Sequence, residues 1–324
     1  MTDCLPPLHY GRYSMLLRAS PAVSVCWLLL AALPPATAQS MNLSAPTTLS
    51  TLSRTWAPPD IDQIVPHVSS DVPCPLPDIL EGTKVRAKEF VSNLQEFSAT
   101  ERLEHVDFDK HGKRSSSTTV SYNYVAEIQE VRPGQLSIEE YRNGSIALDV
   151  FPAQLATRGT AGLALIFHPA FVNDFDMRCE GLANLNGKSA WQLRFAQRPD
   201  RPSRFRGYWL SKGWFPVKLK GRAWIATDTH NPLRIETDLL EPINAIPLKT
   251  EHVAIDYQSV QFPQRKVNLW LPHEVEIYMD FRGHRYYRRH TFSNFQLFWV
   301  DVSQRDHVPE NPKILSESPD PKGR

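Results

Sequence analysis

The chain has 324 residues, of which 41% are hydrophobic and 22% charged, and its formal net charge is +1 at pH 7. A balance this close to neutral gives no global attraction to nucleic acid or to an anionic membrane surface. The length is sufficient for one large domain with tails. No nucleic-acid partner is therefore predicted.

The first 38 residues have the three parts of a secretory signal peptide. Arg12 and Arg18 precede an apolar run at residues 22–33, and the small-residue triplet Ala-Thr-Ala follows at 36–38. The apolar run is too short to span a bilayer, so a cleaved signal peptide is the preferred interpretation and a retained anchor the alternative. The pattern predicts cleavage near residue 38 and a mature protein exported across the inner membrane, with the bacterial periplasm as its location.

The predicted signal segment carries one more basic than acidic residue, so its removal brings the net charge of the chain to zero. Met1 and Met15 both stand as start sites, because either one keeps the basic, apolar and small-residue regions in order. No later segment is apolar for long enough to span a membrane.

The remaining chain divides by composition into a leader, a domain and a tail. Residues 39–72 are rich in Ser, Thr and Pro without hydrophobic period, which predicts a flexible leader. Residues 73–302 are predicted to form a single β domain, and the Pro-rich, charged residues 303–324 a disordered tail. Cys74 and Cys179 are the cysteines left after cleavage; they either form a disulfide, which export permits, or remain two separate thiols.

One amphipathic helix is predicted ahead of the strands, at residues 77–97. Asp78 stands where a helix cap is expected, and an apolar stripe follows at spacings near 3.6, formed by Leu80, Val85, Ala87, Phe90, Val91 and Leu94. Such a stripe predicts packing against a sheet. A second helix is predicted within residues 152–171.

Period-2 alternation of apolar and charged residues predicts a long antiparallel meander with one apolar face. Asn143-Gly144, Asn186-Gly187 and Arg282-Gly283 stand between alternating runs at the spacing of tight hairpins. The predicted strands are residues 99–108, 117–131, 136–142, 145–150, 175–182, 190–197, 205–209, 217–227, 233–239, 251–262, 274–281 and 284–300.

No recognised motif assigns a catalytic or metal-binding role. The chain has no P-loop, no Gly-x-Ser-x-Gly and no dinucleotide fingerprint. His284 and His290 lie an even number of residues apart and share a strand face, but no third metal ligand is identified. Charged stripes such as Lys218, Lys220 and Arg222 are interpreted as solvated strand faces. We predict no cofactor, no metal and no catalytic residue.

The apolar strand faces have two interpretations: a core packed between sheet and helices, or the lining of a cavity for an acyl chain. A curved sheet with large side chains leaves irregular space, and ligand cavities are lined mainly by apolar and aromatic groups. The candidate lining residues are Trp191, Phe195, Ile225, Ile235, Ile277, Met279 and Phe295.

Three short stretches carry a resemblance to a known family. They are Asn-Leu-Gln-Glu-Phe-Ser-Ala at 93–99, Gly-Arg-Ala-Trp-Ile at 221–225 and Pro-Leu-Arg-Ile-Glu at 232–236. With the signal peptide and the helix, they resemble the LolA/LolB-like outer-membrane lipoprotein-sorting proteins. Phe-His-Pro at 167–169 and Cys-Glu-Gly at 179–181 are similar to motifs of an uncharacterised set of secreted bacterial proteins.

This resemblance implies an α+β fold that is mainly β, an unclosed and strongly curved antiparallel sheet wrapped around one or two helices. It also implies an apolar interior that receives lipid tails. The first functional hypothesis is a non-enzymatic carrier or binding protein, with a lipid or acylated lipoprotein as partner and a membrane-associated receptor as a further one. The alternatives are a structural module of the cell envelope with a self-filled core, and a hydrolase with an unrecognised site.

Overall fold

The computed structural model describes residues 55–69, 71–94, 96–143, 159–203, 206–210 and 213–298, all within one compact unit of the chain. The predicted signal peptide, the predicted strand at 145–150 and the predicted tail lie outside these residues. Among the described residues, no helix combines the length and the hydropathy needed to cross a membrane.

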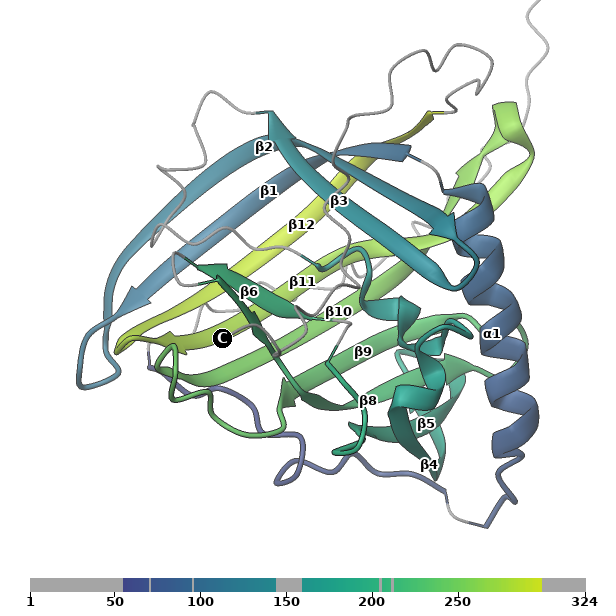
Figure 1. Cartoon of the computed structure of the whole chain (residues 1–324), viewed down its shortest axis with the longest axis horizontal. Coiled ribbons are helices and arrows are strands. Elements are labelled where there is room, and N and C mark those ends of the chain that lie inside the picture. The colour runs from purple at the N-terminus through teal and green to yellow at the C-terminus, as the bar shows by residue number, and fades with distance from the viewer. Residues whose placement is uncertain are drawn as a thin grey trace, which may run out of the picture. The chain divides into compact units, whose positions relative to one another are not determined.

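Ten strands of the described chain form one antiparallel sheet in the order β3-β2-β1-β12-β11-β10-β9-β8-β5-β4. The predicted unclosed, curved antiparallel sheet is confirmed, since β3 and β4 end this order without pairing to each other (Figure 1). The strands are β1 (Glu96–Phe108), β2 (Arg114–Arg132), β3 (Gln135–Asn143), β4 (Phe175–Leu185), β5 (Lys188–Gln197), β8 (Leu219–Ala226), β9 (Pro232–Leu239), β10 (Leu248–Phe262), β11 (Val267–Phe281) and β12 (His284–Phe298). A separate hairpin joins β6 (Gly207–Leu210) to β7 (Gly213–Pro216).

Two of the predicted tight turns have the backbone that a two-residue hairpin loop requires. Asn186 and Gly187 have φ of 51° and 83°, and Arg282 and Gly283 have φ of 54° and 79°. Positive φ at both central positions matches the right-handed twist of the flanking strands. These turns fix the register of β4 with β5 and of β11 with β12, and therefore which side chains face the concave side.

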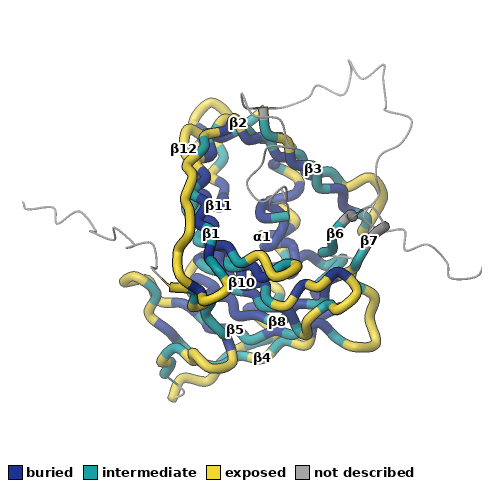
Figure 2. Tube along the Cα trace, turned by 90° about the vertical axis from the view of Figure 1, so that its left-hand side faces the viewer, coloured by how far each residue is buried: buried dark blue, intermediate teal, exposed yellow. Residues whose placement is uncertain are grey.

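The predicted helix is α1 (Leu76–Asn93), which lies inside the curve of the sheet, with β2 and β3 above it and β8 and β10 below it in Figure 2. It ends four residues earlier than predicted, because Phe97 belongs to β1. The predicted Asp78 cap is wrong: the N-cap is Pro75, without a side-chain hydrogen bond, and Asp78 lies in the first turn. A carboxylate there still interacts favourably with the helix dipole.

The buried face of α1 differs from the predicted stripe at Val85, which is 46% exposed. Thr83 and Ala87 are buried, and Val85 lies two residues from each. At about 100° per residue, two residues turn the side chain to the opposite side of the helix. Val85 is therefore left facing away from the core.

Gly82 lets α1 approach the turn between β8 and β9. A Cβ at this position would lie 2.4 Å from Cγ of His230, closer than any real contact. Nearby, Nε of Arg86 donates to the carbonyl of Thr229 at 2.8 Å. The glycine that weakens the helix in isolation is required by this close packing.

The predicted second helix is wrong in the part that is described. Residues Leu163–Phe167 form a short 3-10 helix, η3, and Val172–Asp174 form another, η4. His168 precedes Pro169 and is extended, with φ −65° and ψ 142°. A residue before proline is disfavoured in the α region, so η3 cannot continue as a longer helix.

Part of the segment predicted as a leader lies against the convex face of the sheet. Ile61 is 2% exposed, and its N–H donates to Oδ2 of Asp238 at 3.0 Å. Arg222 donates to the carbonyl of Ile64 at 3.0 Å and pairs with Glu180 at 2.6 Å. The interpretation of Arg222 as a solvated side chain is therefore wrong, because this segment covers it.

A disulfide joins Cys74 to Cys179, with their Cα atoms 6.3 Å apart. It connects the residue just before α1 to strand β4, across a sequence separation of 105 residues. Closing a loop of this length restricts the unfolded chain, which stabilises the fold by about 2–4 kcal/mol. The N-terminal end of α1 is thus held covalently to one edge of the sheet.

Candidate binding site

The centre of the concave face is filled by α1 and η3. Leu163, Leu165 and Ile166 of η3 are all 0% exposed, and they pack with Phe90 of α1 in the main core. Each fully buried aliphatic side chain of this kind contributes about 1.5–3 kcal/mol relative to an exposed one. Much of the interior is therefore occupied by the protein's own side chains.

The seven residues predicted to line a cavity all belong to or contact this main core. Five of them are buried, and Trp191 and Phe295 are half-buried against the same cluster. None of the seven lines the three clefts described below. The buried five are Phe195, Ile225, Ile235, Ile277 and Met279.

The largest of these clefts lies between α1 and the β2–β3 hairpin, and we call it the α1 cleft. Its volume is about 850 Å³, within the usual range of about 300–1,000 Å³ for small-molecule sites. It is lined by Val85, Lys88, Glu89, Val91, Ser92, Ile128, Gln129, Glu130, Gly134, His168, Pro169 and Ala170.

Apolar and charged groups share the lining of the α1 cleft. Val91 and Ile128 are buried members of the main core, so they join the cleft to the interior, and the exposed Val85 adds a further apolar surface. Lys88, Glu89 and Glu130 bring one positive and two negative charges, and Glu89 is paired with Arg86. This arrangement can hold an apolar chain against the core while a polar group stays near water.

His168 is the titratable ring in the α1 cleft. Its Nδ1 accepts a hydrogen bond from the N–H of Ala170 at 3.2 Å, so the ring proton belongs on Nε2. Burial lowers the pKa of His168, and Lys88 lowers it further against the opposite effect of Glu130. The ring is therefore neutral at neutral pH and presents an N–H donor rather than a charge.

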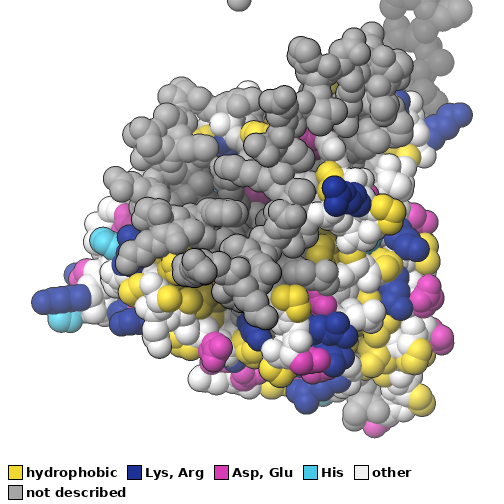
Figure 3. Space-filling model, viewed as in Figure 1, with side chains coloured by type: hydrophobic (Ala, Val, Ile, Leu, Met, Phe, Trp, Pro, Cys, Tyr) yellow, Lys and Arg dark blue, Asp and Glu magenta, His cyan; other side chains and the backbone are white. Residues whose placement is uncertain are grey.

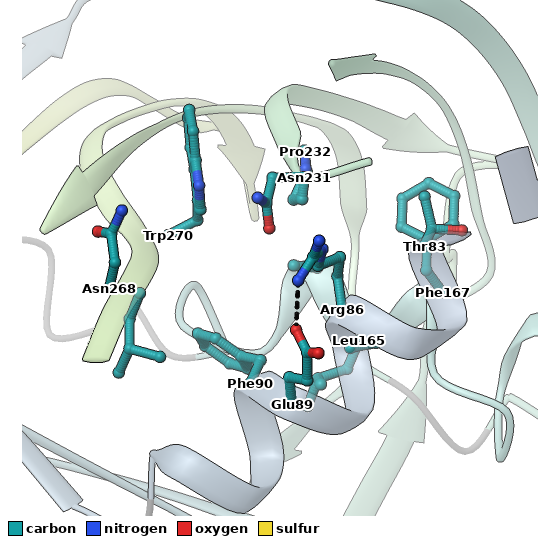
Figure 4. Close-up of a pocket in the computed structure, with 13 residues that line it drawn as sticks. Thr83, Arg86, Glu89, Phe90, Leu165, Phe167, Asn231, Pro232, Asn268 and Trp270 are labelled. Atoms are coloured by element: carbon teal, nitrogen blue, oxygen red, sulfur yellow. Dashed lines mark hydrogen bonds and ion pairs between the residues drawn. The ribbon is translucent and has the colours of Figure 1, made fainter. Parts of the chain in front are cut away.

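A smaller pocket of about 70 Å³ lies on the other flank of α1 (Figure 4). Arg86 and Glu89 form an ion pair of 2.6 Å at its side. Figure 4 shows Trp270 and Asn231 across the pocket from this pair. Phe90 provides part of the apolar lining. The helix thus separates two clefts of different size, and Glu89 lines both of them.

The half of the concave face on β1, β3 and β12, which we call the ionic half, carries buried charged groups among apolar core residues such as Phe97 and Tyr286. Glu101 lies on the same buried face of β1 as Phe97 and Leu103, and its side chain is 0% exposed. Arg142 of β3 donates to its two carboxylate oxygens at 2.5 and 2.9 Å, and Nδ1 of His290 of β12 lies 2.7 Å from Oε1. The unusual pairing of the first and last strands, β1 with β12, brings these groups together.

The charge balance of this cluster follows from its geometry. Burial alone raises the pKa of Glu101, but Arg142 and His290 outweigh it and hold that pKa at about 2. Burial lowers the pKa of His290, with Glu101 acting in the opposite direction. Nε2 of His290 is buried and has no hydrogen-bond partner. The pair is therefore a carboxylate beside a neutral imidazole.

A second histidine continues the ionic half towards the surface. Nε of Arg288 donates to Nδ1 of His105 at 3.1 Å, and Nε2 of His105 lies 2.9 Å from Asp107. Burial lowers the pKa of His105, and the charge of Arg288 adds to this effect. The residues of this cluster line none of the three clefts.

The two histidines predicted to share a strand face do not form a metal site. His290 is buried against Glu101, whereas His284 is exposed at the start of β12. Among the described residues, no group of three or more His, Cys, Asp and Glu side chains is arranged to hold a metal ion.

Sequence reasoning missed the residues of the α1 cleft, although one signal was present. Val85 is out of phase with the other apolar residues of α1, which marks it as a surface valine. His168 and Pro169 belong to a turn whose position depends on the packing of η3, which periodicity does not reveal.

On the face shown in Figure 3, acidic and basic side chains are interspersed among apolar ones.

No protein-family model matches the chain, and no curated protein matches its sequence. Solved structures are similar to it at low identity. A DUF1329 family protein from Desulfovibrio piger has 12% identity and a TM-score of 0.40, covering 72% of this chain and 96% of that one. A putative outer membrane lipoprotein-sorting protein domain from Vibrio parahaemolyticus has 10% identity and a TM-score of 0.35, covering 72% and 93%.

A LolA superfamily protein from Nitrosomonas europaea has 10% identity and a TM-score of 0.34, covering 68% of this chain and 94% of that one. The chain is thus distantly similar in fold to LolA-like structures. A likeness at this level does not extend to ligand or activity, which have to be inferred from the residues of the site itself.

Proposed function

We propose that this protein is an exported, non-enzymatic binding protein that holds the acyl chain of a lipid or lipoprotein in the α1 cleft. The observation that carries this proposal is a cleft of about 850 Å³ whose apolar lining, Val91 and Ile128, belongs to the main core. An acyl chain in this position adds to the core instead of lying on an outer surface.

Removal of apolar surface from water drives such binding without catalytic groups. Each buried methylene contributes about 0.8 kcal/mol. Lys88 and the neutral His168 provide polar donors at the same cleft, which suits a headgroup that remains partly hydrated.

Export is supported by the chemistry of the cysteines as well as by the N-terminal pattern. The Cys74–Cys179 disulfide persists in oxidising compartments such as the periplasm and is rare in the cytosol. The residues predicted as a signal peptide lie outside the described chain, so this part of the proposal depends on their sequence.

The proposal is tested by titrating the full mature chain with laurate, myristate and palmitate. Each pair of added methylenes is expected to tighten Kd about tenfold, because the added carbons enter the apolar cleft. Affinities that do not depend on chain length would contradict an acyl site.

A matched pair of variants places the acyl chain in the α1 cleft. Val85→Asp puts a carboxylate on the cleft lining, whereas Val65→Asp makes the same change at a valine that is 60% exposed and does not line the cleft. We expect Val85→Asp to weaken palmitate binding about tenfold or more, and Val65→Asp to leave it unchanged. Equal effects of the two variants would refute this location.

A structural or interaction module is the second candidate, and the burial of Leu163, Leu165 and Ile166 of η3 favours it. A core that is already filled needs no ligand to be stable. This candidate predicts that none of the three fatty acids binds and that the mature chain is equally stable with and without them.

A further inference from the structure

A third cleft, of about 290 Å³, lies next to Trp270, and no residue of α1 lines it. We call it the Trp270 cleft. Its lining is made of the start of β5, the turn between β8 and β9, and one residue of β11, namely Lys188, Ser189, Ala226, Thr227, Asp228, Thr229, Leu233 and Trp270. Apart from Trp270, Ala226 and Leu233, these are hydroxyl-bearing or charged residues.

We propose that the Trp270 cleft binds a saccharide. The half-buried indole of Trp270 offers a flat apolar wall, and the C–H face of a sugar ring can pack on such a wall. The ammonium of Lys188 lies over the face of that ring, 5.0 Å from its centre, in a cation–π contact. A sugar therefore packs on the indole only when the flexible Lys188 side chain moves aside, where its ammonium can donate to a sugar oxygen. The volume of the cleft is close to the lower end of the range for small-molecule sites, which suits one or two sugar units.

The polar groups of the cleft suit a neutral ligand that is rich in hydroxyl groups. Lys188 and Asp228 carry opposite charges, and neither forms an ion pair with a described residue. An ammonium donates to a sugar oxygen, and a carboxylate accepts from a sugar hydroxyl, so both roles of a hydroxyl group are served. The lining offers no continuous apolar wall for an acyl chain, since most of its residues bear a hydroxyl group or a charge.

Thr229, one of the lining residues, carries an unsatisfied hydroxyl group. Its Oγ1 is buried and has no hydrogen-bond partner. A buried hydroxyl without a partner carries an unfavourable desolvation free energy. A rotation of this side chain towards the Trp270 cleft would let a sugar oxygen satisfy the hydroxyl group.

The turn that carries these groups is fixed before any ligand binds. The N–H of His230 donates to the carbonyl of Ala226 at 3.0 Å, and the carbonyl of Thr229 accepts from Arg86 of α1 at 2.8 Å. The ring of His230 packs against Gly82. Little ordering entropy is therefore lost when a ligand contacts Asp228 and Thr229.

The test is saturation-transfer NMR of the full mature chain with glucose, N-acetylglucosamine and maltose at millimolar concentration. We expect saturation transfer to at least one of them. Lys188→Ala and Asp228→Asn, at two exposed positions, should each weaken it about fivefold. Lys249→Ala, at another exposed lysine that does not line the cleft, is the matched control and should leave binding unchanged.

Thr229→Val separates a ligand role from a structural one. The hydroxyl has no partner in the free protein, so its removal should leave stability unchanged or raise it while weakening saccharide binding. The proposal is overturned if none of the three sugars receives saturation transfer, or if binding persists unchanged in Lys188→Ala and Asp228→Asn. Palmitate binding should be unaffected by these variants, so failure here is distinguishable from failure of the acyl site.

Discussion

The concave face of the sheet has an apolar half beside α1 and η3 and an ionic half on β1, β3 and β12. In the apolar half, Ile166 is 0% exposed and touches hydrophobic neighbours. In the ionic half, Glu101 and His290 are just as buried, but they are held by directional hydrogen bonds.

The difference shows that one sheet face can combine apolar packing, which is non-directional, with a network of directional hydrogen bonds between buried charges. Dispersion and hydrophobic burial are non-directional, so the apolar half tolerates an added methylene chain beside the helix. A buried charge network tolerates little change, because each partner depends on the others. The cleft proposed to bind an acyl chain accordingly lies beside α1, where Val91 and Ile128 of the main core form part of its lining.

The largest expected effect comes from breaking the ionic half. Glu101→Gln leaves the guanidinium of Arg142, whose side chain is 2% exposed, without its carboxylate. We expect a loss of about 3–5 kcal/mol in the free energy of unfolding, measured by urea denaturation. Glu104→Gln on the same strand, where the partner Arg102 is 57% exposed, should lose less than about 1 kcal/mol. Similar losses for both variants would contradict a buried network.

In the apolar half, Ile166→Ala tests packing without charge. Removing buried methylenes leaves a cavity, and we expect a loss of about 3 kcal/mol in the same assay. The value is expected to stay the same from pH 7 to pH 4, because no titratable group is removed. A loss that varied with pH would mean that the two halves are coupled.

Acid should act on the ionic half. Glu101 has a pKa of about 2 when folded against an ordinary 4.5, so its contribution of about 3 kcal/mol is present above pH 4.5 and is lost as pH falls from 4.5 towards 2. The lowered pKa of His290 adds a loss of stability that begins as pH falls below about 6.5. Urea denaturation across this range should show the decrease in the wild type and a flatter profile below pH 4.5 in Glu101→Gln.

The attachment of α1 to the apolar half gives the smallest expected effect. Gly82→Ala would gain about 1 kcal/mol in an isolated helix, but here the new Cβ meets the His230 ring. We expect a net loss of about 1–2 kcal/mol in thermal or urea unfolding. Combining it with His230→Ala should remove most of this loss. A stabilised Gly82→Ala single variant would show that α1 is not held against this turn.

Much of the fold was predictable because it depends on local patterns. The Asn186-Gly187 and Arg282-Gly283 turns and the alternation in β8 to β12 specify hairpins within a short stretch of chain. The end of α1 and the 3-10 conformation of η3 were not predictable from periodicity. Phe97 pairs within β1 instead of continuing the helix, and Pro169 keeps His168 extended, which ends η3.

For the candidate site, the sequence predicted an apolar concave face but not the position of a cleft on it. Alternation identifies which side chains face inward, such as Ile277 and Phe195, but it does not show whether space remains beside them. That space is determined by α1 and η3, which are distant in sequence from those strands. The burial of Arg222 likewise depends on residues near Ile61, far from its own strand.

Native mass spectrometry of the full mature chain, purified from the periplasm without detergent, tests acyl binding in the α1 cleft most directly. We expect a population carrying the additional mass of a lipid or acylated peptide, retained in Val65→Asp and lost in Val85→Asp. Protein that carries no such mass, and that takes up no palmitate on addition, would contradict the proposed function.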